Sequence, residues 1–247
     1  WLVTGYKEAV SVLDNHQAFS SCNSVFEPQA DGVEAFPSII NIDEPRHRKL
    51  RGLAAKAFTP RSIERDWTPR IERIVQEQLD GVGPDVFNVV NDLAYPLPVR
   101  MIAEVIGVDS DNFPQFKYWS DEIAKRIGLP QSFEAGDGPH PAIYLSMYFF
   151  EQVESRRREP RDDLLTRLVE AEVDGERLTP VELGAFLILQ LVAGNETTTN
   201  LIGTAVRVLA EHPEMMERIR NDRSLVWNLV EESLRMDAPI QGFYRKA

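Results

Sequence analysis

The sequence predicts a mainly helical protein. Apolar residues recur three and four positions apart along most of the 247-residue chain, which is the spacing of one helix face. Strand-like alternation is weak, so we expect small β elements only at the two ends, near Trp1 and after Pro239. Hydrophobic residues make up 43% of the chain and charged residues 27%, a balance that allows a buried core and argues against a disordered chain.

The composition of the chain limits the kinds of partner that it can bind and the cellular compartment that it fits. The formal net charge of −12 argues against nucleic acid, because binding to a phosphate backbone needs clustered positive charge. No apolar run reaches the length of a bilayer span, so we expect no membrane segment. The single cysteine, Cys22, excludes an internal disulfide and fits a reducing, cytoplasmic compartment. The four histidines follow no metal-ligand spacing.

The first half of the chain is expected to alternate helices and loops. A short amphipathic helix after Gly5 turns Val10, Val12 and Leu13 inward, and a long loop follows over residues 23–40. The next helix has Asp43 as its cap and a proline in its first turn. Further helices are expected over residues 60–82, within 86–108 after a proline break, and over 111–128.

The second half continues the helical pattern around one long central helix. After a loop over residues 129–141, a helix over 142–160 has an exposed, charged end. The stretch 162–180 is expected to be a helix followed by a turn at Asp174-Gly175. Past the central helix, a short helix begins at Pro213, and a last one ends before Pro239.

The central helix carries an unusual polar insert. Thr179 and Glu182 form a capping box, with Pro180 at the first helical position. An apolar run follows, and then the sequence "GNETTT" interrupts it from Gly194 onward. A helix of this span is about 45 Å long, so the insert is expected near the middle of the protein. One explanation is a buried polar kink that satisfies itself by Ser/Thr back-bonding. The other is that Glu196 and its neighbours face something other than packed hydrocarbon, and that the glycine widens the helix or admits a flat group.

Two further clusters suggest ionic chemistry. His47 and Arg51 are four residues apart, so they share a helix face and suit one carboxylate or phosphate. The alternative is a solvated basic face, which also contains Lys56, Arg61 and Arg65. Glu232 and Arg235 have the i, i+3 spacing of an ion pair, and Arg245 follows on an extended segment as another cation.

Taken in order, these motifs resemble those of the cytochrome P450 family, the haem-thiolate monooxygenases. The motifs are "DEPRHRKLR", "AGNETT", "ESLR" and "PIQGFYR", and "AFTPR" and "LAYPLPVRMIAEVIGV" also fit the soluble bacterial branch. The resemblance implies a mainly α cytochrome P450 fold that is incomplete, with residues 1–247 as a single partial domain. We expect an internal fragment that lacks the N-terminal segment and the C-terminal loop with the haem cysteine. Cys22 lies in the wrong place for that ligand, so no metal ligand is expected in this chain.

The resemblance also implies roles for the central insert. Ala193 and Gly194 would form the kink where dioxygen binds beside the haem. Thr197 would donate a hydrogen bond to the dioxygen, and Glu196 would deliver protons from solvent. Protons delivered in a dry pocket favour oxygen–oxygen cleavage over peroxide release.

The ionic residues acquire roles from the same resemblance. His47, Arg51 and Arg245 would hold the haem propionates. Glu232 and Arg235 would form a structural salt-bridge network under the haem. A basic face that includes Arg48, Lys49 and Arg61 would lie on the side where an acidic ferredoxin docks.

The implied function is haem-dependent insertion of one atom of dioxygen into a hydrophobic small molecule, with electrons from a ferredoxin-type partner. Aromatic residues Phe26, Phe36, Phe133 and Phe243 suggest the apolar substrate. A peroxide-driven relative is disfavoured by the acid–alcohol pair of the insert. The alternative from another class is a truncated or degenerate helical module that binds no haem and catalyses nothing.

Overall fold

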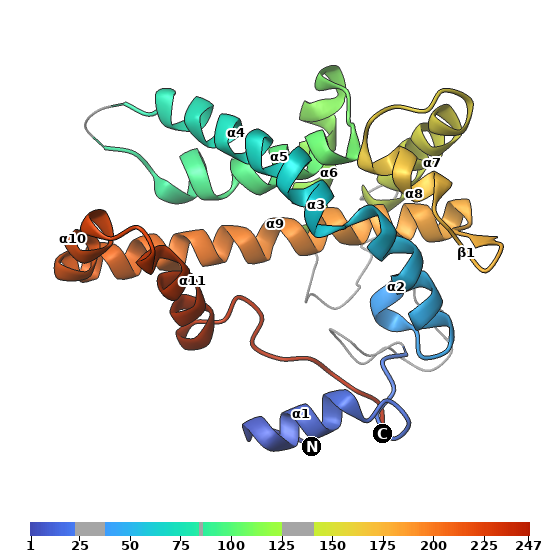
Figure 1. Cartoon of the computed structure of the whole chain (residues 1–247), viewed down its shortest axis with the longest axis horizontal. Helices are drawn as coiled ribbons and strands as arrows, with labels where there is room; N and C mark the ends of the chain where they lie inside the picture. The colour runs from blue at the N-terminus through green and yellow to red at the C-terminus, as the bar shows by residue number, and fades with distance from the viewer. Residues whose placement is uncertain (23–37, 84–85, 125–140) are drawn as a thin grey trace, which may run out of the picture. The chain divides into compact units, whose positions relative to one another are not determined.

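The chain is arranged in two compact units. The computed structural model describes residues 1–22, 38–83, 86–124 and 141–247. The first unit contains Trp1–Thr59, Lys125–Leu189 and Gly242–Ala247, and the second contains Pro60–Ala124 and Gln190–Gln241. Helices dominate both units, as Figure 1 shows, so the mainly helical class is confirmed. That residues 1–247 form a single domain stays a prediction, and the expected loops 23–40 and 129–141 lie largely outside the described residues.

The first unit packs three helices around shared apolar faces. Helix α2 packs on α8, and α8 packs on α7. Leu53 of α2, Phe149 of α7 and Leu165 of α8 are almost completely buried, so they form the core of this unit. The elements before the hairpin are α1 (Tyr6–Asp14), a 3₁₀ turn (Ile39–Asn41), α2 (Arg46–Ala57), α7 (Pro141–Arg158) and α8 (Leu164–Glu170).

A short hairpin lies where the sequence predicted only a turn. Strand β1 (Glu172–Val173) pairs with the antiparallel strand β2 (Glu176–Arg177). Asp174 and Gly175 connect them with φ angles of 53° and 77°, the left-handed conformation that hairpin turns require. The expectation of β elements only at the chain ends was therefore wrong. Two-residue strands are too short to show an alternating pattern.

The start of α2 differs from the predicted cap. The carboxylate of Asp43 does not cap α2 but accepts hydrogen bonds from the Ser20 hydroxyl and, at 2.8 Å, from the Ser21 amide. Ser20 in turn forms an isolated β bridge with Lys246. The C-terminal segment and the residues before α2 are thus tied together within the first unit.

Two further expectations about the first unit need correction. Helix α1 forms as predicted, but Val10 and Leu13 are exposed and the helix buries no residue. The exposed, charged end of α7 is confirmed for Arg157 and Arg158, but Arg156 departs from it and is only 1% exposed. Its Nε donates to Asp163 at 2.8 Å, and the same carboxylate accepts the amide of Thr166 to cap α8.

The second unit is a helical layer with two π-helical turns. Helix α4 packs on α5, α5 packs on α6, and α10 packs on α11. Ile74, Val99 and Phe116 are fully buried and form its core. The elements are α3 (Pro60–Ser62), a π turn (Ile63–Trp67), α4 (Thr68–Asp80), a π turn (Val89–Ala94), α5 (Pro96–Ile106), a 3₁₀ turn (Ser110–Asn112), α6 (Phe113–Ala124), α10 (Pro213–Asn221) and α11 (Leu225–Met236).

Helix α9 (Pro180–Glu211), the long orange helix of Figure 1, contributes residues to both units. Its predicted capping box is confirmed: the Thr179 amide donates to Glu182 at 2.9 Å, and the Glu182 amide donates to Thr179 Oγ1 at 3.2 Å. Burial raises the pKa of Glu182, but hydrogen bonds from Thr179 and Arg46 outweigh it and hold the pKa below its ordinary value. None of the helices in the described stretches has the length and apolar content needed to cross a bilayer.

Candidate active site

The polar insert of α9 has an anchored face within the second unit. Asn195 is 2% exposed and Thr199 is 8% exposed. The Thr199 hydroxyl lies 3.2 Å from the carbonyl oxygen of Ala94 and 3.4 Å from Asn195 Oδ1. The Thr199 hydroxyl therefore has acceptors inside the unit, and the burial of both residues fixes the rotation of α9 about its own axis at this point.

Gly194 serves close packing between helices. A Cβ atom at this position would lie 2.7 Å from Ile102 Cδ1 of α5. Because the residue is glycine, α5 and α9 approach more closely here than a side chain would allow. The widening expected at Gly194 is not present, since α9 is α-helical without interruption from Pro180 to Glu211. The role of Ala193 and Gly194 beside a haem stays a prediction.

The opposite face of the insert is open. Ala193 and Glu196 are exposed, and Thr197 is half-buried. The Thr197 hydroxyl donates to the Ala193 carbonyl at 2.6 Å, which is the back-bonding pattern expected of threonine in a helix. The expectation of a buried Glu196–Thr197 pair was wrong, because the buried polar residues are their neighbours Asn195 and Thr199. The open face offers a carboxylate and a hydroxyl beside a small residue.

The candidate anion-binding cations lie in the first unit. His47 is half-buried, and its Nδ1 lies 3.3 Å from Glu44 Oε1. Arg51 is exposed, and it forms no ion pair with any residue in the described ranges. Arg245 precedes the bridge residue Lys246, and its Nη1 donates to the Tyr244 carbonyl at 2.8 Å. The α9 insert belongs to the second unit, so the two groups of candidate residues lie in different units.

Glu232 and Arg235 form the ion pair that their spacing predicts. Arg235 Nε donates to Glu232 Oε2 at 2.8 Å, and Nη2 donates to Oε1 at 2.6 Å, a forked arrangement within α11. The bonded guanidinium lowers the pKa of Glu232. Both side chains are exposed, so the pair stabilises the helix only modestly.

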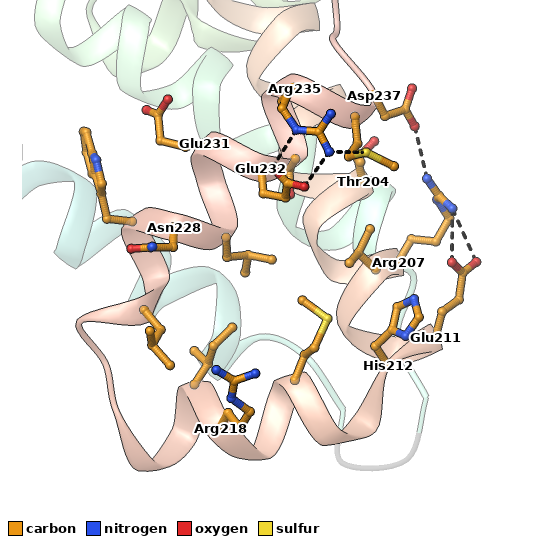
Figure 2. Close-up of a pocket in the computed structure, with 18 residues that line it drawn as sticks. Thr204, Arg207, Glu211, His212, Arg218, Asn228, Glu231, Glu232, Arg235 and Asp237 are labelled. Atoms are coloured by element: carbon orange, nitrogen blue, oxygen red, sulfur yellow. Dashed lines mark hydrogen bonds and ion pairs between the residues drawn. The ribbon is translucent and has the colours of Figure 1, made fainter.

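This pair lines a groove of about 1150 Å³ within the second unit. Figure 2 shows the residues that surround it. Arg207 lies across the groove and binds Glu211 and, at 3.1 Å, Asp237. The Ser233 hydroxyl is buried in the groove wall without a hydrogen-bond partner in the described part of the chain. The groove is lined by α9, α10 and α11, and its floor is largely apolar.

Sequence reasoning missed several residues that organise these sites. Asn195 and Thr199 are four residues apart, and that spacing could have identified them as partners on one face. Asp163 precedes "LLTRL" as an N-cap, which is a signal the sequence does contain. No sequence signal identified its pairing with Arg156. The described ranges contain no group of three or more His, Cys, Asp or Glu side chains arranged to hold a metal ion, and Cys22 is an exposed free thiol.

Comparison with known proteins defines the class. The family model for "Cytochrome P450" matches residues 137–240. A cytochrome P450 109 of Bacillus spizizenii is 37% identical over 252 residues, which cover 100% of this chain and 60% of that protein. The structure of cytochrome P450 CYP109Q5 from Chondromyces apiculatus matches with a TM-score of 0.87 and 38% identity, covering 99% of this chain and 61% of that one.

A further neighbour is CYP109E1 from Bacillus megaterium in complex with testosterone, with a TM-score of 0.83 and 36% identity over 97% of this chain and 61% of that one. The fold and the ordered motifs together match those of bacterial cytochrome P450 proteins. The chain belongs to the cytochrome P450 family. It spans about 60% of the length of the relatives it matches.

Proposed function

We propose that this chain carries the oxygen-activating part of a haem-dependent monooxygenase that acts on a hydrophobic small molecule. The observation that carries the proposal is the open face of α9, where Ala193, Glu196 and Thr197 project away from the anchored side of the helix. A carboxylate and a hydroxyl beside a small residue can supply a proton and a hydrogen bond to a ligand on this face. Membership of the cytochrome P450 family supports the same assignment.

The residues present fit part of a haem site. Arg51 is a cation without an ion pair in the described ranges, and His47 is half-buried one turn before it, so the two suit a propionate carboxylate. Arg245 would provide a further cation. The only cysteine, Cys22, is exposed and lies outside every motif of the family, so we do not assign it as the iron ligand. When bound, haem supplies the redox chemistry that splits dioxygen.

The proposed work of the α9 residues follows from their contacts. The Thr197 hydroxyl has one proton, which it donates to the Ala193 carbonyl at 2.6 Å. It must rotate away from that carbonyl to donate to a ligand on the open face. Glu196 is exposed, so it can exchange protons with solvent and pass them toward Thr197. Asn195 and Thr199 take no part in this transfer but hold the face in position.

Electrons would come from an acidic redox protein of the ferredoxin type. Helix α2 exposes Arg48 and Lys49 in a chain of net charge −12, so it is a local basic surface. Arg61 belongs to the second unit, so we restrict the docking surface to α2. We place the protein in the cytoplasm, where the Cys22 thiol stays reduced.

The substrate class is an apolar small molecule. Phe243 is one of the aromatic residues expected to line its pocket, and the relative CYP109E1 binds testosterone in its structure. The segments around Phe26, Phe36 and Phe133 lie outside the described residues. A compound with a rigid hydrocarbon skeleton is therefore the first class to screen.

The family chemistry is tested by the reduced, carbon monoxide-bound absorption spectrum. We would record it on the natural polypeptide and on residues 1–247, each supplied with haem. We expect the thiolate-type spectrum in the natural polypeptide, whose ligand must come from outside the 247 residues. Absence of that spectrum from both would contradict the monooxygenase proposal and favour a helical module without haem chemistry.

The role of Thr197 is tested by measuring how much peroxide the enzyme releases per electron consumed. Thr197→Ala in the natural enzyme removes the hydroxyl from the open face, so we expect several-fold more peroxide released per electron consumed. Thr198→Ala is the matched control, because Thr198 is also exposed on α9 but belongs to neither the anchored nor the acid–alcohol pair. Equal peroxide release from both variants would contradict the assigned role.

A further inference from the structure

The basic surface of α2 is partly neutralised by the β hairpin of the same unit. Lys49 Nζ lies 2.7 Å from Glu176 Oε1, and Arg46 Nη1 lies 3.0 Å from Glu176 Oε2. One carboxylate of β2 therefore holds two cations of α2. The side chain of Glu176 is 45% exposed and that of Lys49 is 44% exposed, so the contact is open to solvent and to any approaching protein.

The hairpin does not depend on this contact for its position. Strand β1 packs directly on α2, and Lys56 donates to the backbone carbonyl of Glu172. Arg46 also has a second partner, Glu182, at the start of α9. The Glu176 carboxylate is thus presented to α2 by a scaffold that other contacts hold in place.

A carboxylate placed in this way occupies the same donors that an acidic partner would use. Lys49 donates to Glu176, and that bond lowers the pKa of Glu176, so the carboxylate is charged at neutral pH. The neighbouring Arg48 has a side chain that is 79% exposed, and it keeps only a 3.5 Å contact with Glu44. The hairpin therefore shields one part of the basic surface and leaves the rest to attract a partner.

We propose that Glu176 is an internal competitor for the electron donor, bound to Lys49 and Arg46 until an acidic ferredoxin-type protein displaces it. The inference rests on the proposed function, because it assumes an acidic redox partner at α2. Exposed ion pairs contribute little stability, so the carboxylate can leave its cations at small cost when partner carboxylates replace it. The result is a docking surface of moderated affinity, from which a partner also dissociates quickly after electron transfer.

The test compares two carboxylates of the same hairpin in the haem-loaded natural protein. Glu176→Gln releases Lys49 and leaves Arg46 paired with Glu182 alone. Glu172→Gln makes the same change in net charge but removes a carboxylate that pairs with Arg177 at 3.0 Å. The probe is an acidic [2Fe–2S] ferredoxin, with Kd measured at low and at high salt. We expect Glu176→Gln to tighten binding about two- to fivefold at low salt, and Glu172→Gln to change it by less than about half as much.

Repeating the Glu176→Gln substitution in a Lys49→Gln variant tests whether the competition acts through Lys49. In Lys49→Gln protein the gain from Glu176→Gln should largely disappear, because the competition acts through that ammonium group. An independent readout is the rate at which an acetylating reagent modifies Lys49, which should rise in Glu176→Gln and stay unchanged in Glu172→Gln.

Three results would overturn the inference. Equal tightening by both hairpin variants would mean that only net charge matters. Ferredoxin binding that Glu176→Gln leaves unchanged would refute the competitor alone and leave the proposed function intact. Faster acetylation of Lys49 in Glu176→Gln, without ferredoxin binding by any variant, would refute the acidic electron donor and the competitor with it.

Discussion

Arg156 is the largest side chain that the described part of the protein buries completely, and it makes a sharp test of the packing in the first unit. Its Nε donates to Asp163 Oδ2 at 2.8 Å, and its Nη1 donates to Gln152 at 2.8 Å. The other oxygen of Asp163 caps α8 by accepting the amide of Thr166. Asp163 therefore neutralises a buried charge of α7 and closes the start of α8.

The perturbation we would make is Asp163→Ala. Removing one partner of a buried ion pair costs about 3–5 kcal/mol, because the carboxylate that neutralises the buried charge is lost. Loss of the cap adds about 1 kcal/mol. We therefore expect the free energy of unfolding to fall by about 4–6 kcal/mol. Asp163→Asn keeps an oxygen that can cap α8 and should cost less than Asp163→Ala.

The assay is urea unfolding followed by far-UV circular dichroism. The matched control is Asp162→Ala, since Asp162 is the neighbouring carboxylate, pairs with Arg167 at 3.1 Å and has a side chain that is 88% exposed. An exposed pair of this kind contributes about 0–1 kcal/mol. If Asp163→Ala and Asp162→Ala lowered the unfolding free energy by the same amount, the account of the buried pair would be wrong.

Three further predictions concern the second unit. Thr199→Val should lower the free energy of unfolding by about 1–2 kcal/mol through loss of a buried hydrogen bond, and exposed Thr198→Val should change it by less than about 0.5 kcal/mol in the same urea titration. Gly203→Ala should stabilise α9 by up to about 1 kcal/mol, because its new methyl group makes an ordinary contact. Gly194→Ala should stabilise the helix less, because its methyl group would lie close to Ile102 of α5. Equal gains in unfolding free energy would refute the close approach of α5 and α9. The pKa of Glu232 is lowered in the folded protein, so its ion pair stabilises the protein above the ordinary glutamate pKa of about 4.3. That stabilisation is lost as the pH falls through the lower pKa of the folded state. The difference in Tm between wild type and Glu232→Gln should therefore shrink from about pH 7 to about pH 3.

Helix positions could be predicted from the sequence because periodicity and capping are local signals. The capping box at Thr179 and Glu182, the pair at Glu232 and Arg235, and the turn after β1 all depend on residues within a few positions of one another. Each of these was found where the sequence indicated it. The family resemblance added the order of the motifs, which no single motif could supply.

The contacts that escaped prediction join residues that are distant in sequence or compete for one group. Asp43 was expected to cap α2, but Ser20 and Ser21 bind its carboxylate from more than twenty positions away. Burial of Glu196 was expected because the whole insert looked internal. Which of the six consecutive polar residues from Asn195 to Asn200 turn inward depends on the rotation of α9, and packing against α5 and the preceding π turn determines that rotation.

The anchoring of α9 has a consequence for how this chain tolerates change. Each residue added to an α-helix turns everything beyond it by about 100°. A one-residue insertion between Asn195 and Thr197 would therefore swing the Thr197 hydroxyl off the open face, or force Thr199 to abandon the carbonyl of Ala94. The length of the insert is accordingly constrained more tightly than the identity of an exposed side chain such as Thr198.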